Sequence, residues 1–297
     1  MIITQLLGGM GNQMFQYAVG RHLALKNAHL LKLDTSVLLD WKPGRHFVNR
    51  DFDLDIFNIK PLIANRKDIA NYSPQLMTKR GKIVYHLRKK LGLVNIVRET
   101  YFTFNSEILE LKGDQYLTGL WQSYKYFVDI RDIIREDFTI TMPMDKHSLQ
   151  MLNEITKSNS VCINVRRGDY VSVKQTADIL GFIGTQYYQD AISYIENQII
   201  DPVFFIFSDD IDWCKQNLIL TNRSVFYVDH SHAGIKFSSY LQLMQSCKNF
   251  IIPNSTFAWW AAWLCQTDNK LIISPKKWFN DPNLDTSDLI PPTWVRL

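Results

Sequence analysis

Short apolar runs alternate with amphipathic segments along the second half of the chain. The runs are rich in Val, Ile and Phe and have the length of buried strands, and the segments between them carry apolar residues at helical spacing. Because strands that alternate with helices pair in parallel, the predicted fold class is α/β. The pattern predicts strands at 161–165, 203–207, 225–228, 249–252 and 270–273, and helices at 186–197, 212–218, 237–245 and 255–264.

The first residues show the same alternation. Residues 1–7 are mostly apolar and predict a strand, which a glycine-rich turn follows. The pattern then predicts a helix to about Asn27 and a second strand at 30–34. The opening residues carry no basic group, which favours a strand over a signal peptide.

The pattern is weaker between about 40 and 150, and Pro143 interrupts it before the regular alternation begins. With 297 residues the chain is long enough for two hydrophobic cores. We therefore expect two domains, at 1–150 and 151–297. The terminal run 291–294, rich in Pro and Trp, is expected to pack against the first domain.

The composition is that of an ordinary globular protein, with 46% hydrophobic and 21% charged residues. The net charge of +4 is too small to indicate nucleic-acid binding but suits a small anionic ligand. The four cysteines lack C-x-x-C spacing, so we expect reduced, buried thiols rather than zinc ligands or disulfides. The apolar stretch 257–265 is shorter than the roughly 20 residues that span a bilayer, and we expect a cytoplasmic protein.

Three polar segments follow predicted strands directly. In a parallel sheet, ligands bind beyond the carboxyl ends of the strands, so these segments are the candidate binding residues. They are Arg166-Arg167-Gly168-Asp169, Ser208-Asp209-Asp210 and Asn254-Ser255-Thr256.

The arginine pair suggests binding of a diphosphate. A guanidinium stays charged at neutral pH and forms bidentate hydrogen bonds with phosphate oxygens, so Arg166 and Arg167 could stabilise a leaving diphosphate without a metal. The alternative is a structural pair, exposed or bonded to Asp169. The position at the end of a strand, before Gly168, favours the functional interpretation.

Asn254, Ser255 and Thr256 precede a predicted helix, where backbone N–H groups and hydroxyls can receive an anion. They could equally be an ordinary N-terminal cap. The three tryptophans at 259, 260 and 263 share helical spacing, which is typical of a core rather than of a sugar-binding platform.

Asp209 and Asp210 could accept hydrogen bonds from a guanine edge or a ribose. The alternative is a metal site, because Asp210 and Asp212 have D-x-D spacing. The same spacing occurs in 51–55, where acidic and apolar residues alternate as in a half-exposed strand. The nearby arginines make a metal unnecessary and favour base or ribose binding.

The glycine turn resembles a dinucleotide-binding fingerprint, with Asp34 at the end of the second strand as the ribose-binding acid. The third glycine of that fingerprint is missing, because Met14 occupies its position. A turn at Gly11 that presents the Asn12 side chain to a ligand fits the sequence better than an NAD site.

Taken together, the motifs resemble the bacterial-type α1,2-fucosyltransferase family, which uses GDP-fucose. Their order and spacing cover nearly the whole chain. The matching segments are Gly8 to Gln16, Val165 to Tyr170, Phe207 to Asp210 and Asn254 to Trp263.

The resemblance implies two Rossmann-like domains of GT-B type that face each other across a cleft, with GDP-fucose held mainly by the C-terminal domain. It places Arg166 on the diphosphate and Asn12 near the reacting centre. It also implies donor contacts at Gly11, Arg167, Asp209, Asp210, Asn254, Ser255 and Thr256, with no metal or other cofactor. Many family members have a histidine where this chain has Asn164.

The function that follows is inverting transfer of L-fucose from GDP-fucose to the 2-hydroxyl of a galactoside. The expected partners are the donor and a galactose-containing acceptor, with no nucleic acid, and peripheral association with membrane-linked acceptors is compatible with this function. His22 and Asp169 are the candidates for the general base, and the sequence assigns neither. The rival hypotheses are a non-catalytic sugar-nucleotide-binding protein and, third, an NAD-dependent dehydrogenase.

Overall fold

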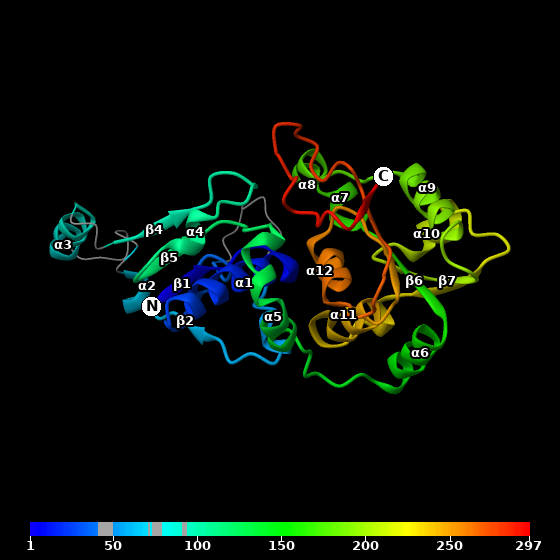
Figure 1. Cartoon of the computed structure of the whole chain (residues 1–297), viewed down its shortest axis with the longest axis horizontal. Helices are drawn as coiled ribbons and strands as arrows, with labels where there is room; N and C mark the ends of the chain where they lie inside the picture. Colours follow the sequence, from blue (N-terminus) through cyan, green and yellow to red (C-terminus); the bar gives the residue numbers. More distant parts are fainter. Residues whose placement is uncertain (41–49, 71, 73–78, 91–93) are drawn as a thin grey trace. The chain divides into compact units, whose positions relative to one another are not determined.

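The computed structural model describes residues 1–40, 50–70, 72, 79–90 and 94–297 (Figure 1). They form two compact units, one of Met1–Thr139 with Asp285–Leu289 and one of Ile140–Leu284 with Ile290–Leu297. Each unit has its own sheet, and every strand pair in the described residues is parallel. The predicted α/β class is therefore confirmed.

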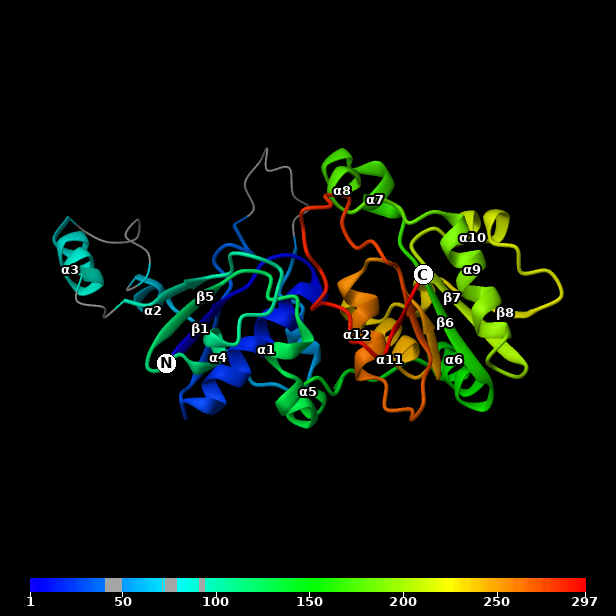
Figure 2. The same cartoon turned by 45° about the horizontal axis from the view of Figure 1, so that its top comes forward.

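The first unit contains a five-stranded sheet in the order β3-β2-β1-β5-β4. Helix α1 packs on one face of this sheet (Figure 2). On the other face, Ile69 of the short α2 packs in a cluster with Ile3 and Tyr116. The elements are β1 (Ile2–Gln5), α1 (Met10–Lys26), β2 (Leu31–Asp34), η1 (Leu54–Ile56), β3 (Leu62–Ile63), α2 (Arg66–Ala70), α3 (Lys79–Lys90), β4 (Ile96–Arg98), α4 (Glu107–Glu110), β5 (Gln115–Thr118), η3 (Tyr124–Tyr126), η4 (Val128–Ile130) and α5 (Arg131–Asp137).

The second unit contains a six-stranded sheet in the order β11-β10-β9-β6-β7-β8. Its elements are α6 (Lys146–Lys157), β6 (Asn159–Val165), α7 (Gly168–Ser172), α8 (Lys174–Ile179), α9 (Thr185–Glu196), β7 (Pro202–Ser208), α10 (Ile211–Asn217), β8 (Ser224–Val228), η5 (His230–His232), η6 (Ile235–Phe237), α11 (Ser238–Gln245), β9 (Asn249–Ile251), α12 (Thr256–Leu264), β10 (Ile272–Ser274) and β11 (Val295–Arg296).

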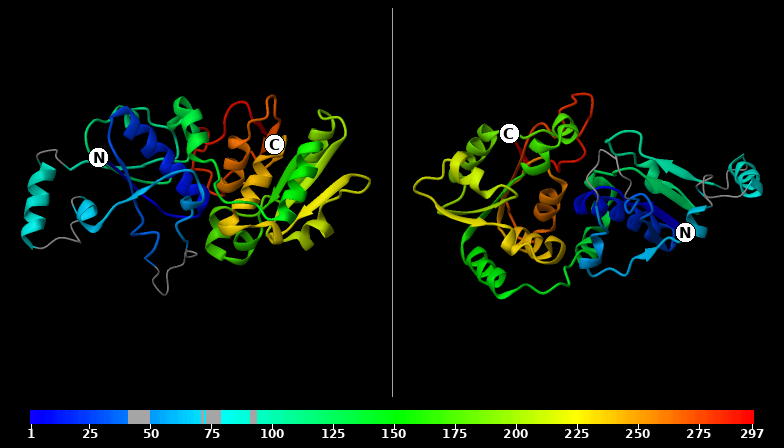
Figure 3. Two further views of the ribbon diagram at one scale, coloured as in Figure 1. Left: turned by 90° about the horizontal axis from the view of Figure 1, so that it is seen from below. Right: turned by 180° about the vertical axis from the view of Figure 1, so that it is seen from behind.

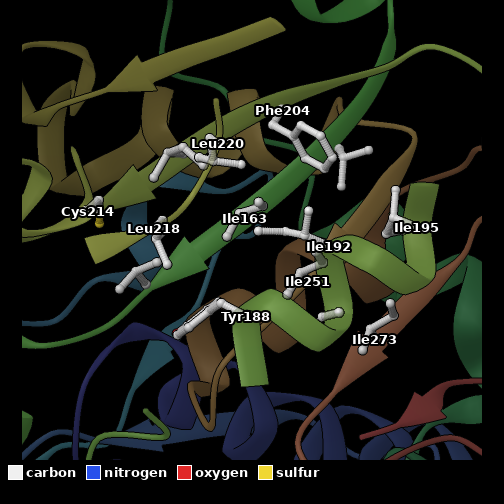
Figure 4. Close-up of a cluster of buried hydrophobic side chains, with 14 of the residues drawn as sticks. Ile163, Tyr188, Ile192, Ile195, Phe204, Cys214, Leu218, Leu220, Ile251 and Ile273 are labelled. Carbon is white, nitrogen blue, oxygen red and sulfur yellow. The ribbon is translucent and has the colours of Figure 1, made fainter. Parts of the chain in front are cut away.

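The core of the second unit lies on both faces of its sheet. On one face Ile192 and Ile195 of α9 pack against Ile163, Phe204 and Ile251 of three adjacent strands, and α10 completes the layer (Figure 4). Helices α6, α11 and α12 lie together on the other face (Figure 3). Both faces are covered, which explains why the strands read as continuous apolar runs.

Helix α12 is buried around most of its circumference. Trp259, Trp260 and Trp263 are all buried, so their interpretation as core residues is confirmed. The ring of Trp294 lies 5.5 Å from that of Trp259. The terminal run 291–294 therefore belongs to the second unit, and the segment that belongs to the first unit is Asp285–Leu289. Packing of the terminal run against the first domain remains a prediction.

The strand predicted at 51–55 is also wrong, since this segment ends in the 3-10 turn η1. The amide of Gln13 donates to the Asp51 carbonyl and accepts from the Asp53 N–H. A helix side chain thus supplies the partners that a neighbouring strand would otherwise supply. All four cysteines are buried and free, as predicted, and no helix in the described residues is long and apolar enough to cross a membrane.

Helix α1 approaches the first sheet closely at Gly20. A Cβ atom at this position would lie 2.2 Å from Thr4 Oγ1 and 2.8 Å from Leu31 Cδ1. The glycine therefore sets the distance between helix and sheet, although glycine in a helix interior costs about 1 kcal/mol relative to alanine.

Gly20→Ala should lower the free energy of unfolding by about 1–3 kcal/mol, because overpacking outweighs the gain in helix propensity. Denaturant unfolding measures the loss. Thr4→Ala removes the clashing oxygen, so Gly20→Ala should cost less in that background than in the wild type. Equal losses in the two backgrounds would contradict this explanation.

Candidate active site

The carboxyl ends of β6 and β7 meet at one edge of the second unit's sheet. The final residues of the two strands, Val165 and Ser208, are paired in register. The segments 166–168 and 209–210 therefore emerge next to each other. Strand β9 is the other neighbour of β6, so 254–256 leaves the same edge.

Asp209 holds the loop that follows β6. Its carboxylate accepts the Arg167 N–H at 2.9 Å and the Gly168 N–H at 3.1 Å, and it pairs with Arg166 Nη1 at 2.8 Å. A Cβ at Gly168 would lie only 2.7 Å from Asp209 Oδ2, so glycine permits this approach. Both carboxylate oxygens of Asp209 are therefore engaged by the protein. A contact between Asp209 and guanosine remains a prediction.

The two arginines have different surroundings. The guanidinium of Arg167 lies 4.2 Å from the Trp213 ring and 5.1 Å from the Phe182 ring, and its Nε donates to Asp210. Its side chain is 20% exposed, whereas that of Arg166 is 33% exposed. Arg166 is therefore the better placed of the two to bind a ligand anion.

Asp210 is engaged by its own neighbourhood. One carboxylate oxygen caps α10 by accepting the Trp213 N–H, and the other accepts from Arg167. Asp212, the second acid of the D-x-D spacing, is 88% exposed and lies 3.7 Å from Lys215. Within the described residues, no cluster of three or more His, Cys, Asp or Glu side chains could hold a metal ion. These contacts give the D-x-D interpretation no support.

Asn254 ties three segments together. Its buried Nδ2 donates to the carbonyls of Leu180 and Trp278, and its own carbonyl accepts from the Tyr170 hydroxyl. The side chain thus holds the loop after β9 against the segments before α9 and after β10. This contact set is structural, and the predicted donor contact of Asn254 remains a prediction.

Ser255 is the N-cap of α12, with its Oγ 3.5 Å from the Ala258 N–H. Thr256 begins the helix and is partly buried. The cap interpretation is therefore correct for Ser255. Phosphate binding by the two hydroxyls remains a prediction.

The glycine turn of the first unit supports the Asn12 side chain. Gly8 has φ +80, and a Cβ there would lie 2.4 Å from Asn12 Nδ2. The Asn12 N–H donates to the Gly9 carbonyl, and its Oδ1 accepts from Gln122 Nε2 at 2.9 Å. The turn thus places the Asn12 amide on the first turn of α1, beside the buried Gly11.

Two glutamines of α1 organise the surrounding loops, and the sequence analysis missed them. The Gln13 amide bonds to the Asp53 N–H, and the Gln16 amide bonds to the Leu7 N–H and the Gly119 carbonyl. Both side chains are fully buried. The available signal was two amides three residues apart on an otherwise apolar helix, directly after a glycine turn.

Glu99 was also missed, because it follows a strand of only three residues, β4, in the weakly patterned region. Its carboxylate accepts the Leu120 N–H at 2.6 Å and the Trp121 N–H at 3.0 Å. Burial raises the pKa of the Glu99 carboxyl above its usual value. Trp121 has φ +57, an uncommon conformation for a bulky residue, and Glu99 stabilises the turn that contains it.

Asp34 does not fit a dinucleotide site. It is fully buried, accepts the Tyr116 hydroxyl at 2.6 Å and accepts the Ser36 N–H at 2.8 Å. Burial, reinforced by this hydrogen bond to Asp34, raises the pKa of Tyr116 well above its usual value. A ribose could not reach the Asp34 carboxylate, which argues against the NAD hypothesis.

The two candidate general bases are His22 and Asp169. The ring Nδ1 of His22 lies 2.7 Å from the Tyr126 carbonyl in a buried position, which indicates a structural residue. The Asp169 side chain lies outside the described side chains. Asn164 donates to the Phe207 carbonyl of β7, so its amide links the two strands.

Comparison with known proteins identifies the class. Two α/β units and an arginine held at a strand end suit a glycosyltransferase, and residues 1–297 match glycosyl transferase family 11. The chain belongs to this family, and the resemblance that the motifs indicated is confirmed.

The chain is 32% identical to an α-1,2-colitosyltransferase of Escherichia coli, over 100% of this chain and 98% of that protein. It is 28% identical to galactoside α-(1,2)-fucosyltransferase 1 of Bos taurus, over 88% of this chain and 65% of that protein. Among solved structures, the fucosyltransferase NodZ from Bradyrhizobium is 13% identical over 88% of this chain and 92% of its own, with a TM-score of 0.47.

Asp209→Asn should weaken GDP binding by about 10-fold or more, because it removes the ion pair with Arg166 and one acceptor for the loop. If Asp209 acts through the loop, the ratio of GDP to IDP affinity should stay as in the wild type. Isothermal titration calorimetry measures both constants.

The matched control is Asp212→Asn, an exposed aspartate on the same segment, which should bind GDP as the wild type does. IDP lacks the guanine 2-amino group. Loss of the preference for GDP over IDP in Asp209→Asn would instead identify Asp209 as a guanine ligand.

Proposed function

We propose that this glycosyltransferase moves L-fucose from GDP-fucose to the 2-hydroxyl of a galactoside, with inversion and without a metal ion. Family membership and the α1,2 linkage in the names of the relatives support the reaction. The observation that carries the donor assignment is Arg166, partly exposed at the carboxyl end of β6 and held by Asp209.

The leaving group explains why this arginine matters. When the anomeric C–O bond breaks, the diphosphate gains negative charge, and a preorganised cation stabilises that charge without reorganisation during the reaction. A guanidinium remains charged at all relevant pH values and can contact two phosphate oxygens. In this proposal Arg167 and the start of α12, with Ser255 and Thr256, assist Arg166.

The reaction is a single displacement. The acceptor hydroxyl oxygen attacks the anomeric carbon, the bond to the diphosphate breaks with its electron pair, and the hydroxyl proton is released. In this proposal the predicted domain 151–297 binds the donor, and the predicted domain 1–150 binds the acceptor side. Asn12 lies near the reacting sugar, where its amide donates hydrogen bonds.

A second donor has a specific observation in its favour. The relative that is 32% identical is named a colitosyltransferase, and colitose is fucose without the 3-hydroxyl. GDP-colitose carries the same nucleoside diphosphate, so Arg166 would bind it in the same way. The two donors differ in one sugar hydroxyl, so only the contacts to that hydroxyl would differ.

The partners and the location follow from the substrates. A doubly charged sugar nucleotide does not cross a lipid bilayer unaided, so the enzyme is expected in the cytoplasm with its donor. The acceptor is a galactose-containing glycan, free or attached to a membrane-linked carrier. The relatives named for galactoside transfer support this class of acceptor.

The direct test incubates the protein with GDP-fucose or GDP-colitose and a panel of β-galactosides, in the presence of EDTA. We expect an α1,2-linked product, identified by mass spectrometry and NMR, at a rate that chelation leaves unchanged. GDP binding without product would favour a non-catalytic sugar-nucleotide-binding protein. Complete loss of activity with EDTA, reversed by magnesium or manganese, would overturn the metal-independent mechanism.

Arg166→Ala should lower kcat/KM by about 100-fold or more, because it removes a preorganised charged donor from the transition state. Arg166→Lys should restore little, because lysine lacks the bidentate fork. Steady-state kinetics with the preferred donor measures both variants. Lys215→Ala, at an exposed lysine of the same unit, is the control and should be unaffected; near-wild-type kinetics for Arg166→Ala would refute the assignment.

A further inference from the structure

The loop that follows β5 carries a buried amide with an unused acceptor. The side chain of Gln122 is 4% exposed, and its Nε2 donates to Asn12 Oδ1 at 2.9 Å. Its Oε1 has no hydrogen-bond partner among the residues that the structure describes. Buried carbonyl oxygens without a partner are rare, because losing the hydrogen bond to water is unfavourable.

This placement is enforced by the surrounding turn. Glu99 accepts the N–H groups of Leu120 and Trp121, and Trp121 is held with φ +57. A Cβ at Gly119 would lie 2.4 Å from Glu99 Cβ, so the backbone approaches the carboxylate closely. Trp121 is thus held in an uncommon backbone conformation, and this conformation orients the next residue, Gln122.

The position in the sheet also suits a ligand site. Strands β1 and β5 are neighbours, so their carboxyl ends lie at the same edge of the first unit's sheet. Asn12 follows β1 and Gln122 follows β5 along the chain. Ligands bind at such an edge in parallel sheets.

The chemistry of the free acceptor limits its partner. A carbonyl oxygen accepts hydrogen bonds only, so a phosphate oxygen, which is also an acceptor, cannot satisfy it. A sugar hydroxyl donates and fits. The neighbouring Asn12 amide accepts from Gln122 Nε2 through its Oδ1, which fixes the orientation of that amide.

We propose that Gln122 is a substrate-binding residue, whose Nε2 orients Asn12 while its Oε1 accepts a hydrogen bond from one hydroxyl of a sugar substrate. The proposal rests on the function proposed above and adds a residue to its sugar-binding site. The buried Oε1 then recognises one sugar hydroxyl, so Gln122 contributes to substrate specificity.

The test measures the penalty for removing single hydroxyls from the substrates. Wild type, Gln122→Met and Gln122→Glu are assayed with a β-galactoside and its 3-, 4- and 6-deoxy derivatives, and with GDP-fucose and GDP-colitose. In the wild type, removal of the recognised hydroxyl should lower kcat/KM by about 10-fold or more, since it leaves a buried acceptor unpaired. In Gln122→Met, removal of the same hydroxyl should lower kcat/KM by no more than about two-fold, while the penalties for the other hydroxyls remain as in the wild type.

The chain offers a matched control. Gln115 begins β5 at the opposite end of the strand, is also buried, and also has an Oε1 without a partner in the described residues. Gln115→Met should therefore keep every penalty of the wild type. Gln122→Glu retains an acceptor oxygen and loses the donor to Asn12, so it should keep the hydroxyl preference at a lower kcat, and it serves if Gln122→Met does not fold.

The outcomes separate the two proposals. Unchanged penalties in Gln122→Met, with an active wild type, would overturn the role of Gln122 and indicate that Oε1 holds only water. Absence of transfer by the wild type would overturn the proposed function, and the same hydroxyl penalties are then read from dissociation constants measured by calorimetry. Absence of both transfer and sugar binding would overturn both proposals.

Discussion

The loop that follows β6 depends on the hydrogen bonds and the ion pair made by the Asp209 carboxylate. Asp209 stands at the end of β7, and the register between β6 and β7 places it beside the loop that begins at Arg166. Two backbone N–H groups and one guanidinium converge on it. Because the sheet fixes this carboxylate, it aligns the loop before any ligand arrives, and preorganised charge is what a leaving diphosphate requires.

Arg167 carries the second positive charge at this edge of the sheet. Arg167 lies over Trp213 and pairs with Asp210, which also caps α10. These contacts join the loop to the helix that follows β7. Both arginines have acidic and aromatic neighbours, and they differ in exposure, since Arg166 is the more exposed of the two.

The first unit achieves the same rigidity mainly with neutral amides. Gln13, Gln16 and Gln122 each bond to a segment distant in the sequence, because an amide has a donor end and an acceptor end. Buried carboxylates contribute as well: Glu99 accepts backbone N–H groups, and Asp34 accepts the Tyr116 hydroxyl.

Much of the fold could be predicted from the sequence, because strand and helix periodicity is a local property. In the second unit the predicted elements from 161 onward lie within about two residues of those observed. The rule that ligands bind beyond the carboxyl ends of parallel strands selected the segments that contain Arg166, Asp209 and Asn254. Between 50 and 139 the strands β3, β4 and β5 have two to four residues, and such short strands are defined by their pairing partners. Their apolar pattern is too short to recognise.

What only the tertiary structure decided is which side chains meet. The sequence by itself placed Arg166 and Asp209 directly after strands and Asn12 in a glycine turn, and it indicated the family through four motifs. It could not show that Asp209 bonds to the loop of Arg166, or that Gln122 reaches Asn12 across 110 positions. Hydrogen bonds between distant segments depend on strand order and register, which arise from packing of the whole sheet and leave no local pattern in the chain.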